Sequence, residues 1–430
     1  MKKLILIFMI LFALATIVAA QIPSSNVWIG ESDRAQFDSL RRSGLDALYN
    51  LDYDKAQKDF KEITRLYPNH AAGPQLLAAR VWIKTLYESR RLQSSLYTSE
   101  SFYSSGEDKV DLKVVNEFRA LTREAKRLSE VRLKQNPKDG EALYWLGATE
   151  GLKASFEEAV ERRHFAALKD GDDSVDHHRE LLKLDPTFID ANLTAGLYEY
   201  VVGSLPLPIK VVAGVTGFRG SKKKGLQLIE SVSRQGTWAR DDAKTLLIVL
   251  YTREKRFAEA LANARELSAR FPRNYLFRLE AADALVAQAE VEREAKNTEA
   301  AVKAEREAFA TFEDLLHDRS VRETVLRALD LVHFKYGEVL LTAGEGERAA
   351  REFLAATRVE HSEPSLVTMA HLFAARAFDL AGKREDALTQ YREVLTRPDI
   401  YAAHGQARKG LAKPYKTETA LAEPAALAGG

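Results

Sequence analysis

The 430-residue chain contains no cysteine, and its 63 basic side chains are nearly balanced by 62 acidic ones. The absence of cysteine excludes a disulfide framework, cysteine-ligated zinc or iron–sulfur sites and a cysteine nucleophile. A formal net charge of +1 gives no basic field over the whole protein, so we expect no nucleic-acid partner. With 46% hydrophobic and 29% charged residues, the composition is that of a folded chain rather than a disordered one.

Long apolar runs are also absent, except at the N-terminus. Lys2 and Lys3 precede an uncharged apolar run from Leu4 to Val18, and the small residues at 18–20 precede Gln21. This pattern predicts a secretory signal peptide, residues 1–20, and therefore a periplasmic or secreted protein if the source is bacterial. The alternative is an uncleaved membrane anchor, because the run lies at the lower edge of the length that spans a bilayer core.

An internal repeat of about 34 residues organises the chain from residue 33 to residue 405. Its first unit is Phe37–His70: if Phe37 is position 1, small residues occupy positions 8 and 20, and Pro68 occupies position 32. A single core stops growing at about 250–300 residues, which also favours an elongated array. We place eight units, which start near Phe37, Ala71, Gly140, Ile189, Asp241, Tyr275, Asp330 and Thr368.

Positions 8 and 20 of these units are Gly, Ala or Ser in every case but one, Ile248. Two antiparallel helices must cross closely there, and a large side chain would push them apart. Position 27 is apolar in most units, but Arg132 interrupts this pattern. Because no single hairpin buries its apolar face alone, neighbouring hairpins must stack into a superhelix.

The pattern resembles the tetratricopeptide repeat superfamily over nearly the whole mature chain, most clearly at Phe37–His70, Gly140–Leu152, Asp241–Asn274 and Thr368–Asp399. The resemblance implies an all-α, right-handed superhelical solenoid of about eight antiparallel hairpins, with insertions in its first half. We expect residues 21–32 to be a linker and residues 406–430 to be a disordered tail. The resemblance further implies a scaffold that holds a protein or peptide, usually on its concave face, and it implies no catalytic activity.

Two insertions, residues 89–110 and 203–220, distinguish the chain from a plain array. The second contains an apolar run, paired prolines and a GFRG turn, and over about 30 residues it resembles the insertion of the eukaryotic tetratricopeptide-39 family. Such a segment could pack on the core, dock at a membrane surface or close an apolar cavity. The last case gives an alternative function, a solenoid that binds a small molecule or lipid. The sequence leaves open whether the insertions are lids.

Candidates for chemistry are few. Glu161 and His164 have the i, i+3 spacing of a metal-ligating pair on a helix, and His177 and His178 follow. The motif occurs once rather than twice, and His178 falls at position 24 of its unit, which is a packing position. We therefore expect no metal, no cofactor and no enzyme.

Positions 2, 5, 9 and 12 of each first helix line the concave face of such an array. They carry polar and aromatic residues here, and tyrosine is enriched where proteins bind each other. The alternative is that these side chains are buried against the protein itself. The candidate partner-binding residues are Arg41, Tyr144, Leu193, Leu197, Tyr200 and Thr245.

Overall fold

The computed structural model describes residues 29–92, 110–161, 163–204, 220–317, 325–326 and 328–416. Every regular element among these residues is helical. The elements are α2 (Glu31–Tyr49), α3 (Tyr53–Leu66), α4 (Ala72–Glu88), α5 (Leu112–Gln135), α6 (Gly140–Phe156), the π-helix η3 (Glu157–Glu161), α7 (His164–Leu184), the 3-10 turn η4 (Ile189–Ala191), α8 (Asn192–Ser204), α10 (Lys222–Gln235), α11 (Arg240–Arg253), α12 (Phe257–Arg270), α13 (Tyr275–Glu294), α14 (Thr298–His317), α16 (Leu329–Thr342), α17 (Gly346–Ala356), α18 (Pro364–Leu380), α19 (Arg384–Leu395) and α20 (Ala403–Ala412).

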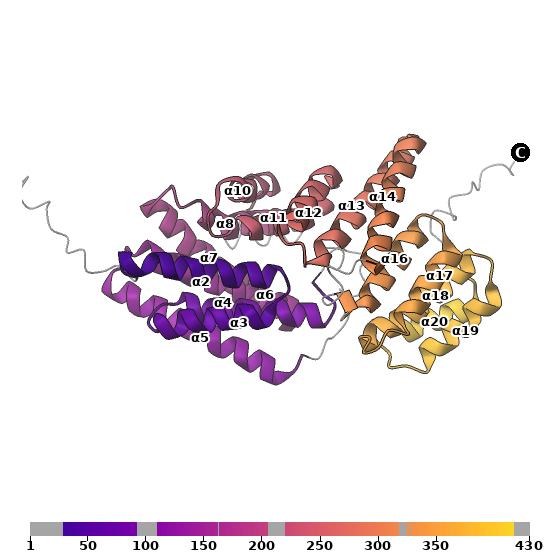
Figure 1. The fold of residues 1–430 in the computed structure, drawn as a ribbon, viewed down its shortest axis with the longest axis horizontal. Coiled ribbons are helices and arrows are strands. Elements are labelled where there is room, and N and C mark those ends of the chain that lie inside the picture. Colours follow the sequence, from indigo (N-terminus) through magenta and orange to yellow (C-terminus); the bar gives the residue numbers. More distant parts are fainter. Residues whose placement is uncertain are drawn as a thin grey trace, which may run out of the picture.

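Consecutive helices of the described chain pair into hairpins, and each hairpin packs on the next, which confirms the predicted all-α solenoid. Figure 1 shows the chain winding from the indigo first hairpin through the magenta and salmon helices to the yellow end. The hairpins are α2–α3, α4–α5, α6–α7, α8–α10, α11–α12, α13–α14, α16–α17 and α18–α19.

Glycine at position 8 lets the two helices of a hairpin approach closely. A Cβ atom added to Gly337 would lie 2.7 Å from the ring of Phe353, and one added to Gly147 would overlap the ring of His178. In both hairpins the opposing ring belongs to position 24 of the same unit. The small residue therefore leaves room for a buried ring of the second helix. This role is more specific than the close helix crossing that the sequence suggested.

Gly147→Ala should destabilise the protein by about 1–3 kcal/mol, because the new methyl group overpacks a rigid, buried ring. Gly405→Ala is the matched control: Gly405 lies inside α20, and no atom would lie within 4 Å of its Cβ. There the substitution should be neutral or stabilising, since alanine favours the helix. Urea denaturation of the two variants measures the difference, and equal shifts would contradict the assigned register.

The turns inside most of the hairpins share one backbone geometry. The second residue after the first helix has a positive φ, as at Gly344 (83°) and Gly382 (73°), and the following N–H donates to a carbonyl of the helix's last turn. This is a Schellman cap, in which the left-handed residue lets the chain reverse while orphan carbonyls are satisfied. Leu51 and Arg90 hold the corresponding positions in the first two units, with φ of 63° and 59°.

The ends of the array differ in part from expectation. The first helix of the described residues begins at Glu31, inside the expected linker, and the expected disordered tail is wrong for residues 406–412, which belong to α20. α20 packs on α18 and α19, and Gly410 lies against the ring of Tyr391. The helix is needed there because the last hairpin would otherwise expose its apolar side.

Several sequence predictions fall on parts of the chain that the structure does not describe. These are the signal peptide, residues 93–109 of the first insertion, and residues 205–219 of the second. The questions of membrane anchoring and of lids therefore stay predictions. Within the described residues, none of the helices combines the length and the apolar character that crossing a bilayer requires.

Candidate functional site

Inner-facing residues of three first helices meet in the interior of the superhelix, although they lie far apart in the sequence. Arg41 on α2 reaches Trp238, which precedes α11, and its guanidinium carbon lies 5.1 Å from the ring centroid. Tyr144 on α6 contacts the same ring edge to face, at 5.0 Å between centroids. Arg41, Tyr144, Trp238, Asp242 and Thr245 are called the inner face below.

Aromatic rings form one wall of the inner face. Phe188 lies 5.1 Å from Tyr144 and 5.6 Å from Trp238, and Trp145 stacks on Trp238 at 5.6 Å. Tyr144 is 8% exposed, whereas Trp238 is half-buried. Ring contacts of this kind stabilise a rigid, largely apolar surface with polar edges. Of these four rings, Phe188 and Trp238 are half-buried and form the part of the wall that solvent reaches.

Arg41 is the most unusual residue of the inner face. It is 5% exposed, yet its Nε lies 3.6 Å from Asp38 Oδ1, beyond hydrogen-bond distance, and has no other partner among the described residues. Burial lowers the pKa of Arg41, and the Asp38 carboxylate opposes that shift. Buried donors are normally hydrogen-bonded, so an Nε without an acceptor needs an explanation.

Two carboxylates, Asp190 and Asp242, lie near the Tyr144 hydroxyl. Asp242 is reached by solvent but is enclosed by protein on several sides, and this loss of hydration raises its pKa to about 6. Asp190 accepts hydrogen bonds from the backbone N–H groups of three consecutive residues, 237–239, at 2.8–3.1 Å, and so fixes the start of α11. Burial raises the pKa of the Tyr144 hydroxyl, and the charges of Asp190 and Asp242 add to that shift.

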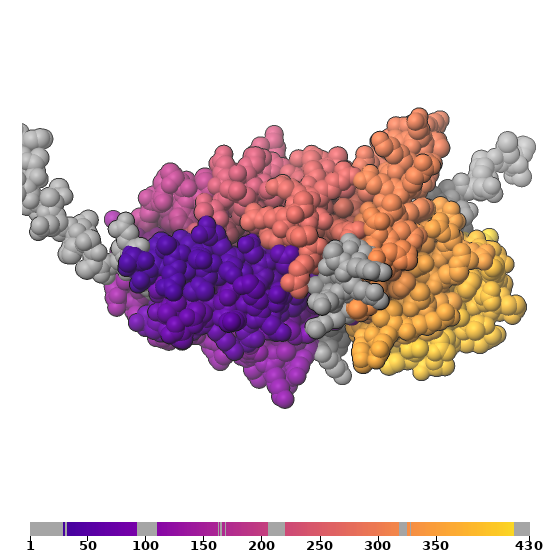
Figure 2. Space-filling view, in the orientation of Figure 1, coloured from indigo at the N-terminus to yellow at the C-terminus, as the bar shows by residue number. Residues whose placement is uncertain are grey.

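The first hairpin closes over the inner face by docking on the start of α13. The Nδ2 of Asn274 donates to the carbonyl of Tyr49 at 2.7 Å, and the N–H of Arg273 donates to Asn50 Oδ1 at 3.2 Å. The Tyr49 ring stacks on Phe271 at 4.7 Å, and its hydroxyl donates to the Asp242 carboxylate. We call this set of contacts the seam; Figure 2 shows the indigo first hairpin directly against the salmon helices.

A second contact closes the superhelix on the other side of the first two units. Arg90, in the turn after α4, places Nε 3.0 Å from Asp330 Oδ1 at the start of α16. Both side chains are buried, with 7% and 1% exposed. Asp330 also accepts from the backbone N–H groups of Leu331 and Glu363, each at 2.9 Å. The early and late units are therefore joined directly, across about 240 residues.

The structure brings together three of the six predicted site residues, Arg41, Tyr144 and Thr245. Thr245 is half-buried, and its hydroxyl donates to the Asp241 carbonyl at 2.9 Å. Tyr200 lies elsewhere: it is fully buried, and its hydroxyl donates to Glu254 at 2.7 Å.

Leu193 and Leu197 are both half-buried, and Leu193 packs on the main core. For Tyr144 and Tyr200 the structure matches the alternative of burial against the protein itself. Sequence reasoning missed Tyr49, Trp238, Arg273 and Asn274. No signal in the repeat pattern marks them, because they lie at helix ends and in turns.

Glu161 and His164, the candidate metal-ligating pair, are described only in part by the structure. No group of three possible ligands that could hold a metal ion occurs in the described ranges, and Glu161 is bound by Arg119. His178 is engaged at both nitrogens: Nε2 donates to the Tyr144 carbonyl at 3.0 Å, and Nδ1 bonds Thr194. The side chain of His164 lies outside the described part of the structure.

A buried carboxyl pair lies near this helix but outside the inner face. Burial, together with the neighbouring Asp170, raises the pKa of Glu157 to about 7. Lys153 pairs with Asp170 at 2.7 Å, and Arg163 lies 3.4 Å from Glu157. The local charges are therefore nearly balanced, and the pair connects η3 to α7.

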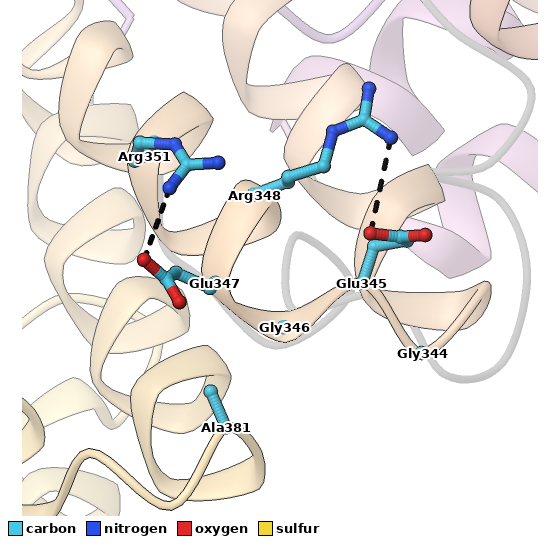
Figure 3. A pocket seen from close by; sticks show the side chains of 7 residues that line it. All are labelled: Gly344, Glu345, Gly346, Glu347, Arg348, Arg351 and Ala381. Carbon is cyan, nitrogen blue, oxygen red and sulfur yellow. Dashed lines mark hydrogen bonds and ion pairs between the residues drawn. The ribbon is translucent and has the colours of Figure 1, made fainter.

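A surface pocket of about 500 Å³ opens at the turn between α16 and α17. Figure 3 shows that its charged side chains are paired with one another: Arg351 bonds Glu347 at 3.2 Å, and Arg348 lies 3.9 Å from Glu345. Such mutual pairing leaves no convergent group for a ligand. The lining residues are Gly344, Glu345, Gly346, Glu347, Arg348, Arg351 and Ala381.

No family model matches the chain, and no curated protein matches it. Solved structures that resemble it include the human IFIT1 dimer with PPP-AAAA, which is 16% identical with a TM-score of 0.43 over 89% of this chain and 86% of that one. Yeast Tom70 is 12% identical with a TM-score of 0.36, over 89% and 88%. A tetratricopeptide repeat protein from Parabacteroides merdae is 14% identical with a TM-score of 0.31, over 78% and 98%.

Similarities this low carry no argument about a ligand or partner. The chain's own geometry carries the conclusion on its fold. Helix hairpins repeat along the described chain, and each hairpin stacks on the next. Within hairpins, small residues pack against rings of the facing helix. The fold is that of a tetratricopeptide-like α-solenoid.

Proposed function

We propose that the protein is a non-enzymatic scaffold that binds a segment of a protein partner at its inner face. The observation that carries the proposal is Arg41, a buried guanidinium whose Nε has no hydrogen-bond acceptor among the described residues. A partner segment would supply the missing acceptor, for which a backbone carbonyl suffices. Arginine, tyrosine and tryptophan are also the residue types that dominate binding energy at protein interfaces.

The surroundings of Arg41 define what the segment offers. The half-buried Trp238 ring favours an apolar or aromatic side chain, and the exposed carboxylate of Asp242 favours a hydrogen-bond donor. A peptide carries acceptors, donors and side chains along one chain and can meet all three needs. This combination is why we favour a protein segment over a small ligand.

Arg41→Gln should weaken binding of the partner by about 2 kcal/mol, roughly thirtyfold, if Arg41 is a central contact. Arg42→Gln is the matched control, since Arg42 is the next residue of α2 and is exposed. The mature chain first captures its partner from the envelope fraction of its source, and the affinities of both variants are then measured by titration calorimetry. Equal affinities for the two variants would remove the inner face from the proposal.

We also propose that residues 1–20 are a cleaved signal peptide and that the scaffold acts in the periplasm or outside the cell. Lys2, Lys3 and the apolar run that follows support this. N-terminal sequencing of the protein from its source should begin at or near Gln21. A membrane-bound chain that still begins with Met1 would show an anchor instead.

A further inference from the structure

We propose that the C-terminal end of α2 is a built-in occupant of the partner surface, and that a partner helix ending in a tyrosine takes its place. The proposal rests on the proposed function, because it names the kind of segment that the scaffold would accept. The docking surface is formed by Asp242, Phe271, Arg273 and Asn274. It is defined by the chemistry of the segment that occupies it in this structure.

The contacts at the seam are those by which a scaffold recognises a helix end. Asn274 binds a main-chain carbonyl of α2, at Tyr49, rather than a side chain. The carbonyls at the end of a helix have no partner within the helix, so such a donor selects helix ends in general. Asn274 is 5% exposed, and its Oδ1 accepts from the N–H of Leu276 at 3.1 Å, which fixes the direction of the amide.

Selectivity within the seam comes from the tyrosine. The Tyr49 ring lies on Phe271 with an interplanar angle of 16°, and the hydroxyl reaches Asp242. A phenylalanine would keep the stacking and leave the enclosed carboxylate of Asp242 without its donor. A leucine would lose both contacts. The surface therefore distinguishes a helix that ends in tyrosine from other apolar helix ends.

The residues of the seam are also more exposed than those of the core, so we expect the seam to open more readily. Tyr49, Asn50 and Asp52 are half-buried, and Arg273 is exposed. The ion pair between Arg273 and Asp52 spans 3.3 Å, with 49% and 30% of the side chains exposed, and pairs of this kind contribute little in water. By contrast, the core rings of the first hairpin, Phe37 and Phe60, are fully buried. Opening the seam would uncover the Phe271 ring, which is 1% exposed, but would leave Phe37 and Phe60 in the core.

The experiment exchanges the occupant. A fluorescent peptide with the sequence of residues 31–52 is titrated, with anisotropy as the readout, into the full mature chain, into Tyr49→Ala, and into Tyr49→Ala combined with Asn274→Ala. In Tyr49→Ala the protein's own helix has lost its anchor, whereas the free peptide keeps it. We expect this variant to bind the peptide about tenfold tighter than the wild type, a difference of about 1.4 kcal/mol. The added Asn274→Ala should abolish the gain.

The matched control is a peptide in which the residue corresponding to Tyr49 is alanine; it should bind none of the proteins above background. Tyr49→Phe, which removes only the hydroxyl, keeps the test valid if Tyr49→Ala folds poorly, and should show a smaller gain in the same direction. Equal peptide binding by the wild type, Tyr49→Ala and the double variant would overturn the proposal. Concentration-dependent dimerisation of the wild type would overturn it as well, by assigning the seam to α2 of a second copy.

The peptide test is independent of the natural partner. A peptide that discriminates among the three proteins supports the seam even where the Arg41→Gln comparison fails, in which case the natural partner uses another face. A natural partner that depends on Arg41, combined with a peptide that does not discriminate, supports the scaffold and rejects the built-in occupant.

Discussion

Asp330→Ala should lower the free energy of unfolding by about 3–5 kcal/mol, the range expected when one partner of a buried ion pair is removed. The Asp330 carboxylate is 1% exposed and faces the buried Arg90 guanidinium, which would lose this counter-charge. The same carboxylate caps two backbone N–H groups, at Leu331 and Glu363, and both would lose their acceptor. Urea denaturation at pH 7, followed by circular dichroism, measures the loss.

The matched control is Asp314→Ala. Asp314 also belongs to an ion pair, 3.9 Å from Arg278, but its side chain is 75% exposed. Exposed pairs contribute about 0–1 kcal/mol, so this variant should remain close to the wild type. The double variant Arg90→Met with Asp330→Asn should recover part of the loss, because it leaves no buried charge. Similar losses for Asp330→Ala and Asp314→Ala would mean that the contact between early and late units does not exist in solution.

Acidification should destabilise the protein through His178, by about 3 kcal/mol at pH 4. Burial lowers the pKa of His178 to about 4, whereas an unfolded histidine titrates near 6.5. The neutral ring is therefore favoured in the fold, and its stabilising effect is complete above pH 6.5 and is lost as the pH falls towards 4. The cause is structural: a proton on Nδ1 would turn towards Thr194 in a dry site beside Gly147.

The measurement compares the wild type with His178→Gln by denaturation at several pH values between 7 and 4. The wild type must be compared with the variant because Glu157 and Asp242 have raised pKa values and act in the opposite direction. Their protonation on acidification favours the folded state in both proteins. The stability curve of the wild type should fall more steeply than that of the variant, by about 3 kcal/mol over the range. Parallel curves would show that His178 is not buried as a neutral ring.

The repeat pattern predicted the hairpins because it reports contacts between neighbours in sequence. Small residues at Gly44, Gly147 and Gly337 mark helix crossings, and each crossing is a local requirement of one hairpin. The same pattern placed Arg41, Tyr144 and Thr245 on one surface, because position within a unit fixes the direction of a side chain. These parts of the fold and of the site follow from periodicity alone.

The closure of the superhelix could not be predicted in this way. Tyr49 meets Asn274, and Arg90 meets Asp330, at separations of 225 and 240 residues. Such pairs depend on the pitch and curvature of the whole array, which result from small rotations between hairpins and from the length of each insertion. The end helix α20 escaped prediction for a related reason, since residues 403–412 follow no repeat and are ordered only by packing on α18 and α19.

The central claim is that the first hairpin closes on the start of α13, and the distance between two spin labels tests it most directly. The chain has no cysteine, so cysteines placed at Asp54 and Pro272, two exposed sites beside the seam, label cleanly. Pulsed electron paramagnetic resonance on the full mature chain should then give one short distance with a narrow distribution. A long or broad distribution, as an open superhelix would produce, would contradict the closed structure described above.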